Sequence, residues 1–380
     1  MSDDTDQIDR HWMRHALDEG RRGVGLTSPN PPVGAVIVIE KEGMIRGGNR
    51  LTGEIIGRGW HRRAGGPHAE IEALRDAAEN GRDVRGATIY ITLEPCSTQG
   101  RTGPCTEALA AAGLRRVVWG ARDPNPQHAG RAEALLREAG LEVTTGVLEL
   151  ECSGLIRPFA KWVTTGMPYV IAKAAQSLDG RLTRPPGESQ WLTSEAARAH
   201  GRSLRREVDA VLVGAETVRQ DNPRLTFRPG DANHATGPQP PKDEEFHAAE
   251  AARPQPWRVV LSRSGRLPAG AHLLTDEHKD RTLVLPGPDL PSALRELAGR
   301  GIVSVLIEGG GDVLNQAFQH RLVDEVQWYV AARLCGAGVP VLGRTSEWTA
   351  SVELKNPQYS FFADDFCVRA TPLWPNSSPA

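Results

Sequence analysis

Short apolar runs alternate with helical patterns along most of this 380-residue chain. In about the first 150 residues, the periodicity predicts strands at 33–39, 87–92 and 116–120, and helices at 9–22, 68–79, 104–112 and 129–139. Strands that alternate with helices usually build a largely parallel sheet with helices on both faces. The sequence therefore predicts a layered α/β domain at the N-terminus.

A second α/β pattern begins at the apolar run 169–175, after a connecting helix predicted around 149–165. It continues with a helix predicted at 194–206 and strands at 210–213, 257–261, 281–285, 303–307, 325–331 and 366–370. The stretch 230–256 is rich in proline, alanine and charge and has no sustained period, so it is predicted as an exposed insertion. A chain of this length is expected to form about two domains. We therefore predict an N-terminal domain over 1–149, a linker helix over 150–167, a C-terminal domain over 168–373 and a tail over 374–380.

The composition excludes some functions. The chain has 39% hydrophobic and 24% charged residues and a formal net charge of −2, which argues against a large nucleic-acid interface. No apolar stretch approaches the roughly 20 residues of a membrane span, and the first residues lack the basic-then-apolar run of a secretory signal. The five cysteines, an odd number, do not indicate a disulfide framework. We expect a cytoplasmic protein with neither a nucleic-acid nor a membrane partner.

Three potential metal ligands stand near two predicted helix starts. His68 opens one helix within His68-Ala69-Glu70, Cys96 follows a strand within Pro95-Cys96, and Cys105 opens a second helix. A catalytic zinc takes three protein ligands and leaves a position for water, whereas a structural zinc usually takes four. The metal lowers the pKa of its water, and a carboxylate that is not a ligand can then carry the proton. His68, Cys96 and Cys105 are therefore predicted as zinc ligands, and Glu70 as the catalytic proton carrier.

The combination of these residues is more specific than any part of it. H-x-E followed by Pro-Cys and a second cysteine is the signature of zinc deaminases that act on nucleobases. Here the two cysteines are nine positions apart instead of three. An isolated H-x-E would fit an ordinary solvated helix start. Two alternatives stay open: a scaffold that binds zinc only for structure, and an RNA-editing deaminase, although no basic stripe interleaved with aromatic residues is present.

A glycine run marks a second candidate site. The strand 303–307 is followed by Glu308-Gly309-Gly310-Gly311-Asp312 and then by a helix from Val313. Glycines between a strand end and a helix start leave backbone N–H groups available to an anion. A simple tight turn is the alternative. No G-x-G-x-x-G motif follows a strand, so a standard dinucleotide-binding fold is not indicated.

The long loop between the two cysteines makes a family resemblance specific. Thr92-Leu93-Glu94-Pro95-Cys96-Ser97, Gly100-Arg101-Thr102 and Pro104-Cys105 resemble the deaminase-reductase family of riboflavin biosynthesis, called RibD. The same pattern includes Ser28-Pro29-Asn30-Pro31-Pro32-Val33-Gly34, Gly59-Trp60-His61, Pro67-His68-Ala69-Glu70 and Asp123-Pro124-Asn125-Pro126. In the second half it includes Lys173, Ser177-Leu178-Asp179-Gly180-Arg181, Gly187-Glu188-Ser189-Gln190-Trp191, Thr217, Asp221-Asn222-Pro223-Arg224-Leu225-Thr226 and Glu308-Gly309-Gly310-Gly311. The resemblance covers almost the whole chain except the insertion and the tail.

The resemblance implies a fold and two reactions. It implies a cytidine-deaminase-like three-layer α/β/α domain followed by a dihydrofolate-reductase-like α/β domain. The first would remove an amino group hydrolytically from a diaminopyrimidinone ribotide, and the second would reduce the ribosyl chain of the product to ribityl. Zn²⁺ and NADPH are the implied cofactors, the pyrimidine ribotide is the small-molecule partner, and a homo-oligomer is expected.

Matching by position assigns the remaining site residues. In the deaminase, the ribotide would contact Asn30, His61 and Arg101. The residues that would face the nicotinamide cofactor are Ala175, Trp191, Thr217, Asp221, Gly310, Gly311, Asp312, Val313, Leu314, Asn315 and Gln316. Those that would face the ribotide in the reductase are Lys173, Ser189, Arg205, Leu225, Arg228 and Glu308. The positively charged side chains of Lys173, Arg205 and Arg228 would bind the phosphate of the ribotide.

Simpler interpretations of single residues remain beside this assignment. Asn30 fits a turn asparagine and His61 a surface histidine, while Lys173 could extend from a strand to solvent and Arg205 could cap a helix. The chain also departs from the family pattern at two positions. Thr98 stands where the family usually has a histidine, and Gly103 where it usually has a proline.

Overall fold

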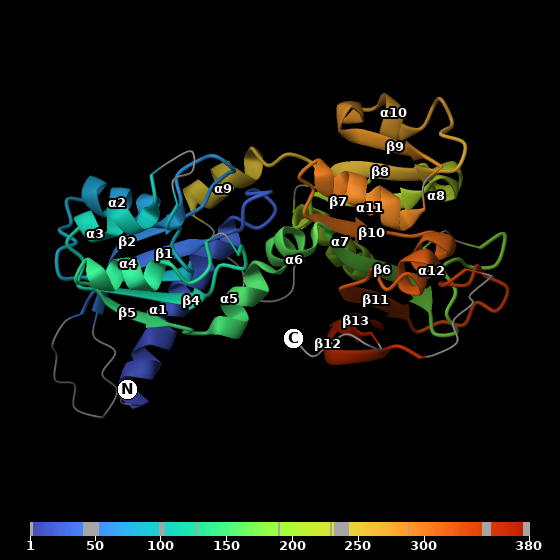
Figure 1. Ribbon diagram of the computed structural model, residues 1–380. Helices are drawn as coiled ribbons and strands as arrows, with labels where there is room; N and C mark the ends of the chain where they lie inside the picture. The colour runs from blue at the N-terminus through green and yellow to red at the C-terminus, as the bar shows by residue number, and fades with distance from the viewer. Residues whose placement is uncertain are drawn as a thin grey trace. The chain divides into compact units, whose positions relative to one another are not determined.

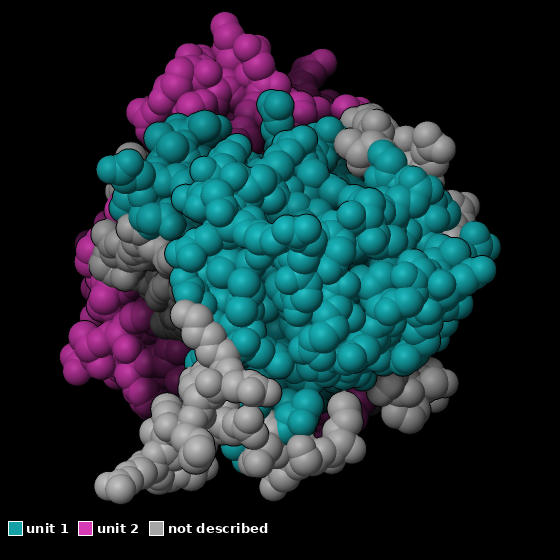
Figure 2. Space-filling view, turned by 90° about the vertical axis from the view of Figure 1, so that its left-hand side faces the viewer, with its two compact units in different colours: residues 1–165, 238–253 teal, residues 166–237, 254–380 magenta. Residues whose placement is uncertain are grey.

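The chain folds into two compact units. The computed structural model describes residues 3–40, 53–98, 103–126, 128–188, 191–228, 230–231, 243–287, 289–343 and 351–374 (Figure 1). Unit 1 contains Met1–Thr165 and Pro238–Arg253, and unit 2 contains Gly166–Gly237 and Pro254–Ala380 (Figure 2). No helix within the described ranges is long and apolar enough to cross a bilayer.

Unit 1 is built on a mixed five-stranded sheet in the order β2-β1-β3-β4-β5. Its strands are β1 (Gly34–Glu40), β2 (Gly53–Trp60), β3 (Thr88–Leu93), β4 (Arg116–Ala121) and β5 (Glu142–Thr145). β1 pairs antiparallel with β2 and β3, whereas β3, β4 and β5 are parallel. The prediction of a largely parallel sheet is therefore wrong for this unit. The sequence did not reveal β2, since three glycines interrupt its apolar pattern.

Helices cover both faces of this sheet. The helices of unit 1 are α1 (Asp3–Arg22), α2 (Ala69–Glu79), α3 (Cys105–Ala111), α4 (Ala132–Glu138), α5 (Glu149–Leu155), α6 (Arg157–Thr165) and α9 (Glu244–Ala251). A Cβ atom on Gly34 would lie 2.1 Å from the carbonyl oxygen of Ala16, so α1 packs directly on β1. A Cβ atom on Gly59 would lie 2.2 Å from the carbonyl oxygen of Ala69, so α2 is equally close to β2. The strand glycines thus permit the closest helix contacts of the layers.

The predicted linker and insertion differ from the structure. The linker helix expected over 150–167 is two helices, α5 and α6, and both belong to unit 1. In the insertion expected over 230–256, residues 232–242 lie outside the described residues, but α9 forms in the second half and belongs to unit 1. Phe246 of α9 is 5% exposed. Because it is the one large apolar side chain of the helix, no period indicated a buried face.

Unit 2 contains an eight-stranded sheet in the order β12-β13-β11-β6-β10-β7-β8-β9. Its strands are β6 (Tyr169–Ser177), β7 (Ala210–Gly214), β8 (Trp257–Ser262), β9 (Thr282–Pro286), β10 (Ser304–Ile307), β11 (Glu325–Ala331), β12 (Glu353–Phe362) and β13 (Asp365–Leu373). The six strands from β11 to β9 are parallel, and the β12–β13 hairpin adds an antiparallel edge. The sheet of unit 2 is therefore largely parallel, in line with the α/β pattern predicted for this half of the chain.

The helices of unit 2 are α7 (Glu195–Ser203), α8 (Ala215–Asp221), α10 (His272–Thr275), α11 (Leu290–Gly299) and α12 (Gly311–Gln319), with the 3₁₀ turns Leu204–Arg206 and Lys279–Arg281. α11 and α12 contribute Leu290, Leu294, Leu297 and Leu314 to the main core of the unit. The carboxyl ends of β6, β7 and β10 lie side by side, because these strands are parallel neighbours. Side chains that follow these strands can therefore meet at one edge of the sheet.

The close contact of α1 with β1 predicts a stability effect. Replacing Gly34 with alanine should lower the free energy of unfolding by about 1–3 kcal/mol or more, because its methyl group would overlap backbone atoms of Ala16 and Gly20. Chemical unfolding of the full chain measures this effect. Gly154→Ala in α5 is the matched control, since its nearest neighbouring atom would be 3.8 Å away. Equal stability of the two variants would contradict the described packing.

Candidate active sites of the two units

Three donor atoms from separate parts of unit 1 meet at one point. His68 precedes the first residue of α2, Cys105 is the first residue of α3, and Cys96 lies in the loop after β3. Nδ1 of His68 is 3.3 Å from Sγ of Cys105 and 3.5 Å from Sγ of Cys96. A tetrahedral zinc with Zn–N and Zn–S bonds of about 2.0 and 2.3 Å would separate such donors by about 3.5 Å. The structure brings the predicted ligands together, and their type and spacing fit zinc.

The donors share their protons so that one cysteine is in its metal-binding form, whereas His68 and Cys105 would release a proton when an ion binds. Hydrogen bonds from Cys105 and then His68 lower the pKa of Cys96 to about 4, against the opposing effect of burial. The contact with Cys96 raises the pKa of His68 to about 9. The same cysteine pair and burial raise the pKa of Cys105. Cys96 is therefore a thiolate, which is the form of cysteine that binds metals.

Glu70 lies beside the donors without being one of them. It stands in the first turn of α2, is 3% exposed, and its carboxyl group hydrogen-bonds with the thiol of Cys105. Burial raises the pKa of Glu70; His68 opposes this effect and Cys96 adds to it. A carboxyl group with a raised pKa can hold a proton near neutral pH and transfer it to a substrate.

Two of the predicted ribotide contacts are adjacent in unit 1. Nε2 of His61 is 3.1 Å from the side-chain nitrogen of Asn30, and Nδ1 of His61 is 2.8 Å from the carbonyl oxygen of Pro67. His61 is 2% exposed, so it is not a surface histidine, and burial lowers its pKa. A neutral ring that donates from Nδ1 to Pro67 can accept the Asn30 amide at Nε2. The third predicted contact, Arg101, lies outside the described residues.

The loops around the zinc ligands contain two residues that the sequence analysis missed. Oγ1 of Thr98 is 2.7 Å from Nδ1 of His128, in the loop after β4. The buried carboxylate of Glu94 fixes that loop by accepting the backbone N–H groups of residues 123, 130 and 132. Glu94 lies within the motif Thr92–Ser97, which could have indicated it. His128 had no comparable signal, because it approaches Thr98 only through folding.

Eight of the seventeen residues predicted for the reductase line one cavity of about 490 Å³ in unit 2. These are Lys173, Trp191, Arg205, Thr217, Asp221, Leu225, Arg228 and Glu308. Ser189 lies outside the described residues, and Ala175 and residues 310–316 do not line this cavity. The cavity also has lining residues that were not predicted, namely Glu195, Arg198, Arg202, Asn222, Pro223, Arg224, Thr226 and His272. The spacing of Arg198, Arg202 and Arg205 along one helix face could have revealed two of them.

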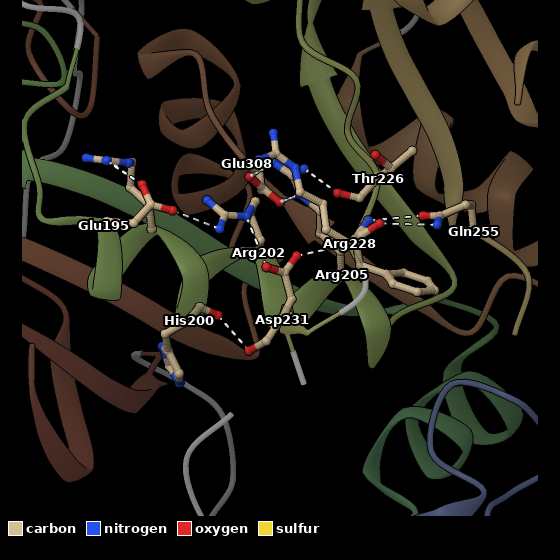
Figure 3. A network of polar contacts seen from close by, with 12 residues as sticks. Glu195, His200, Arg202, Arg205, Thr226, Arg228, Asp231, Gln255 and Glu308 are labelled. Atoms are coloured by element: carbon tan, nitrogen blue, oxygen red, sulfur yellow. Dashed lines mark hydrogen bonds and ion pairs between the residues drawn. The ribbon is translucent and has the colours of Figure 1, made fainter. Parts of the chain in front are cut away.

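A buried ion cluster forms one wall of this cavity (Figure 3). The Glu308 carboxylate follows β10 and lies 2.5 Å from Nε of Arg205 and 3.6 Å from Nζ of Lys173. Burial alone would raise the pKa of Glu308, but Arg205 and then Lys173 outweigh it and bring the pKa to about 2. Nη1 of Arg205 also donates to the carbonyl oxygen of Thr226. Lys173 therefore does not extend to solvent, and Arg205 does not cap its helix.

The rest of the cavity carries an excess of positive charge. Six basic side chains and three carboxylates line it. Asp231, 5% exposed, accepts from Nε of Arg202 and from the backbone N–H of Arg228 (Figure 3). Within the part of the chain that the structure describes, no carboxylate forms an ion pair with the Arg228 guanidinium. Such a surface suits a phosphate group.

The glycine run borders the same region. Gly309 and Gly310 have positive φ angles of 119° and 74°, and α12 begins directly after them. A Cβ atom on Gly310 would lie 3.5 Å from Oγ1 of Thr217, so these two predicted cofactor residues are neighbours. Oδ1 of Asn315 in α12 is buried and has no hydrogen-bond partner among the described residues. The glycine backbone, which carries no side chain, and the unpaired oxygen of Asn315 could both hydrogen-bond with a polar cofactor.

Comparison with known proteins covers both units. The chain matches the family model of the cytidine and deoxycytidylate deaminase zinc-binding region over residues 6–121 and that of the RibD C-terminal domain over residues 168–367. The riboflavin biosynthesis protein RibD of Escherichia coli is 37% identical, over 95% of this chain and 98% of that protein. RibD of Aquifex aeolicus is 35% identical, over 88% and 90%. These matches confirm the resemblance found in the sequence.

Solved structures agree in fold over nearly the whole chain. Acinetobacter baumannii RibD, form 1, superposes with a TM-score of 0.80 at 35% identity, covering 97% of this chain and 100% of that one. A Thermotoga maritima diaminohydroxyphosphoribosylaminopyrimidine deaminase/5-amino-6-(5-phosphoribosylamino)uracil reductase superposes with a TM-score of 0.80 at 32% identity, with the same coverage. The predicted order of a deaminase-like and a reductase-like α/β domain is confirmed. The chain belongs to the RibD family and is a bifunctional deaminase and reductase of riboflavin biosynthesis.

Proposed function

We propose that unit 1 deaminates a diaminopyrimidinone ribotide and that unit 2 reduces the ribosyl chain of the product to ribityl with NADPH. The observation that carries the proposal is the convergence of His68, Cys96 and Cys105 beside the buried Glu70. The Thermotoga relative is named for both reactions on such ribotides, which supports the choice of substrate. The net reaction of the first step exchanges the amino group for a carbonyl oxygen from water and releases ammonia.

In the deaminase, each residue has a defined task. His68, Cys96 and Cys105 would hold Zn²⁺, which supplies a Lewis acid that makes water more acidic. Glu70 would move protons to the pyrimidine ring nitrogen and to the departing amine, since its raised pKa lets it hold a proton. Asn30 and His61 would bind the ribotide. Because the Asn30 amide nitrogen faces His61, its Oδ1 would accept a hydrogen bond from the substrate.

In the reductase, the chain mainly positions two ligands. NADPH would supply the hydride. The residues proposed to hold it are Ala175, Trp191, Thr217, Asp221 and residues 310–316. Glu308, which stays ionised at neutral pH, would accept hydrogen bonds from ribosyl hydroxyls. Arg228, with Lys173 and Arg205 behind Glu308, would attract the phosphate. Ser189 and Leu225 complete the proposed ribotide contacts of the reductase. Arg101 completes those of the deaminase.

The proposal also covers the domain boundaries, the cellular location and the assembly of the enzyme. We assign the deaminase to 1–149, the linker to 150–167 and the reductase to 168–373, in accord with the family matches over 6–121 and 168–367. The helices α5, α6 and α9 within these ranges are packed in unit 1. The near-neutral charge supports a small-molecule enzyme of the cytoplasm that binds neither nucleic acid nor membrane. A homo-oligomer is the assembly that we propose.

Glu70→Gln should reduce deamination by about 10²- to 10⁴-fold, because the amide cannot carry the proton. Ammonia release from the ribotide measures this loss. Zinc content and reduction of the deaminated ribotide should stay at wild-type values. Glu79→Gln, at the exposed end of the same helix, is the control. Undiminished deamination by a zinc-loaded Glu70→Gln protein would remove Glu70 from the mechanism.

Chelation should separate the two activities. After zinc is removed, deamination should fall to background and return when zinc is added, since His68, Cys96 and Cys105 would then lack their ion. NADPH oxidation with the already deaminated ribotide should continue unchanged. The measurement is a coupled assay with and without chelator and NADPH. Deamination by zinc-free protein contradicts the first assignment, and a folded protein that never oxidises NADPH contradicts the second.

Arg228→Ala should raise the KM for the deaminated ribotide by about 10- to 100-fold. A factor of this size corresponds to the binding free energy of one hydrogen bond to a charged group, which the variant would lose. The difference from wild type should shrink for the same compound without its phosphate. Steady-state NADPH oxidation gives both constants. Arg219→Ala is the control, because Arg219 pairs with Glu216 on α8 and does not line the cavity. An equal effect on both compounds would mean that Arg228 does not bind phosphate.

A further inference from the structure

The helix α9 is part of unit 1 although the chain enters it from unit 2 and returns to unit 2 after it. In sequence, the cavity residues Leu225 and Arg228 precede it and β8 follows it. Figure 1 shows α9 beside the sheet of unit 1. A segment of the reductase half of the sequence is therefore a structural part of the deaminase unit.

Two buried arginines attach this segment. The Arg22 side chain, at the end of α1, is 3% exposed and donates to both oxygens of Asp243 at 2.9 and 2.5 Å. The Arg253 side chain, just after α9, is 1% exposed and donates to the carbonyl oxygen of Val24 at 2.8 Å. Burial removes these guanidinium groups from water, so their N–H groups need acceptors within the protein. The position of α9 is thus tied to the end of α1 and the turn that follows it.

Glu245 of α9 holds the chain on both sides of His61. Its carboxylate accepts the indole N–H of Trp60 at 3.0 Å and forms an ion pair with Arg62 at 2.7 Å. Trp60 is 3% exposed, so its N–H needs an acceptor within the protein. Trp60 ends β2, and Arg62 directly follows His61.

The Arg253 contact reaches the other half of the ribotide pair. Val24 lies in the turn that leads to Asn30. Within that turn, the backbone N–H of Asn30 donates to the carbonyl oxygen of Thr27, and the Thr27 hydroxyl donates back to the carbonyl oxygen of Asn30, both at 2.9 Å. The α9 segment therefore supports both stretches of backbone that deliver Asn30 and His61.

We propose that α9 is a positioning element of the deaminase site and that Glu245 is a positioning residue, which fixes His61 through Trp60 and Arg62. The inference rests on the proposed function, since it takes Asn30 and His61 as contacts of the ribotide. The contacts described for α9 do not reach His68, Cys96, Cys105 or Glu70. Loss of the α9 contacts should therefore weaken ribotide binding and leave the rate of the deamination step unchanged.

The test compares Glu245→Ala with Glu244→Ala, the exposed neighbour in the same helical turn, in the full-length enzyme. Glu245→Ala should raise the deaminase KM about 5- to 10-fold with kcat within about twofold of wild type, because a binding contact is misplaced. Zinc content and the kinetics of the reductase should not change. Glu245→Gln should recover most of the KM, as its amide oxygen still accepts the Trp60 N–H. A wild-type KM, or a parallel fall in kcat and zinc content, would overturn the inference.

Hydrogen exchange gives a readout that needs no substrate. The backbone N–H of His61 donates to the carbonyl oxygen of Val33 at 2.9 Å. Glu245→Ala should accelerate exchange in peptides that cover 23–33 and 58–62, and Glu244→Ala should not. Unchanged exchange would overturn the inference. If exchange changes as expected but the wild type does not deaminate the ribotide, the proposed function fails and the role of α9 as a support of this backbone stands.

Discussion

Two buried carboxyl groups, Glu70 and Glu308, have pKa values shifted in opposite directions, because burial acts on them in different surroundings. A carboxylate removed from water must gain cationic partners or keep its proton. Glu308 has Arg205 and Lys173 within ion-pairing distance, so it stays ionised. Glu70 has weaker compensation from His68 and its pKa rises. The fold thus creates an anionic acceptor in one unit and a proton carrier in the other from the same side chain.

The regular elements with clear periodicity could be predicted from the sequence, and so could the zinc ligands. His68, Cys96 and Cys105 are recognisable because the chemistry of zinc restricts both the residue types and their local context. The ion partners of Glu308 were harder to predict. Arg205 was expected to face a phosphate, but which charge it neutralises depends on how the 3₁₀ turn after α7 meets the end of β10. That contact joins residues about a hundred positions apart.

Elements without a dominant apolar period were missed for a physical reason. β2 contains three glycines, two of which α2 requires for its close approach, and such a strand has little side-chain pattern to read. α9 buries one phenylalanine and is otherwise fixed by ion pairs. His61 was open to interpretation as a surface histidine for a related reason, since its ring contacts Asn30 and Pro67, which approach it only through folding. Polar attachment leaves no periodic signal, because charged residues are also the ordinary residues of a surface.

The assignment of α9 to unit 1 means that the chain passes between the two units three times, after residues 165, 237 and 253. During synthesis, the ribosome delivers the chain from its N-terminus, and domains usually fold in that order. Here the first unit cannot complete its fold when residue 165 emerges. Arg22 and Trp60 must wait for Asp243 and Glu245, which arrive only after the first strands of the second unit have been made. The deaminase unit is thus finished only when part of the reductase has already left the ribosome.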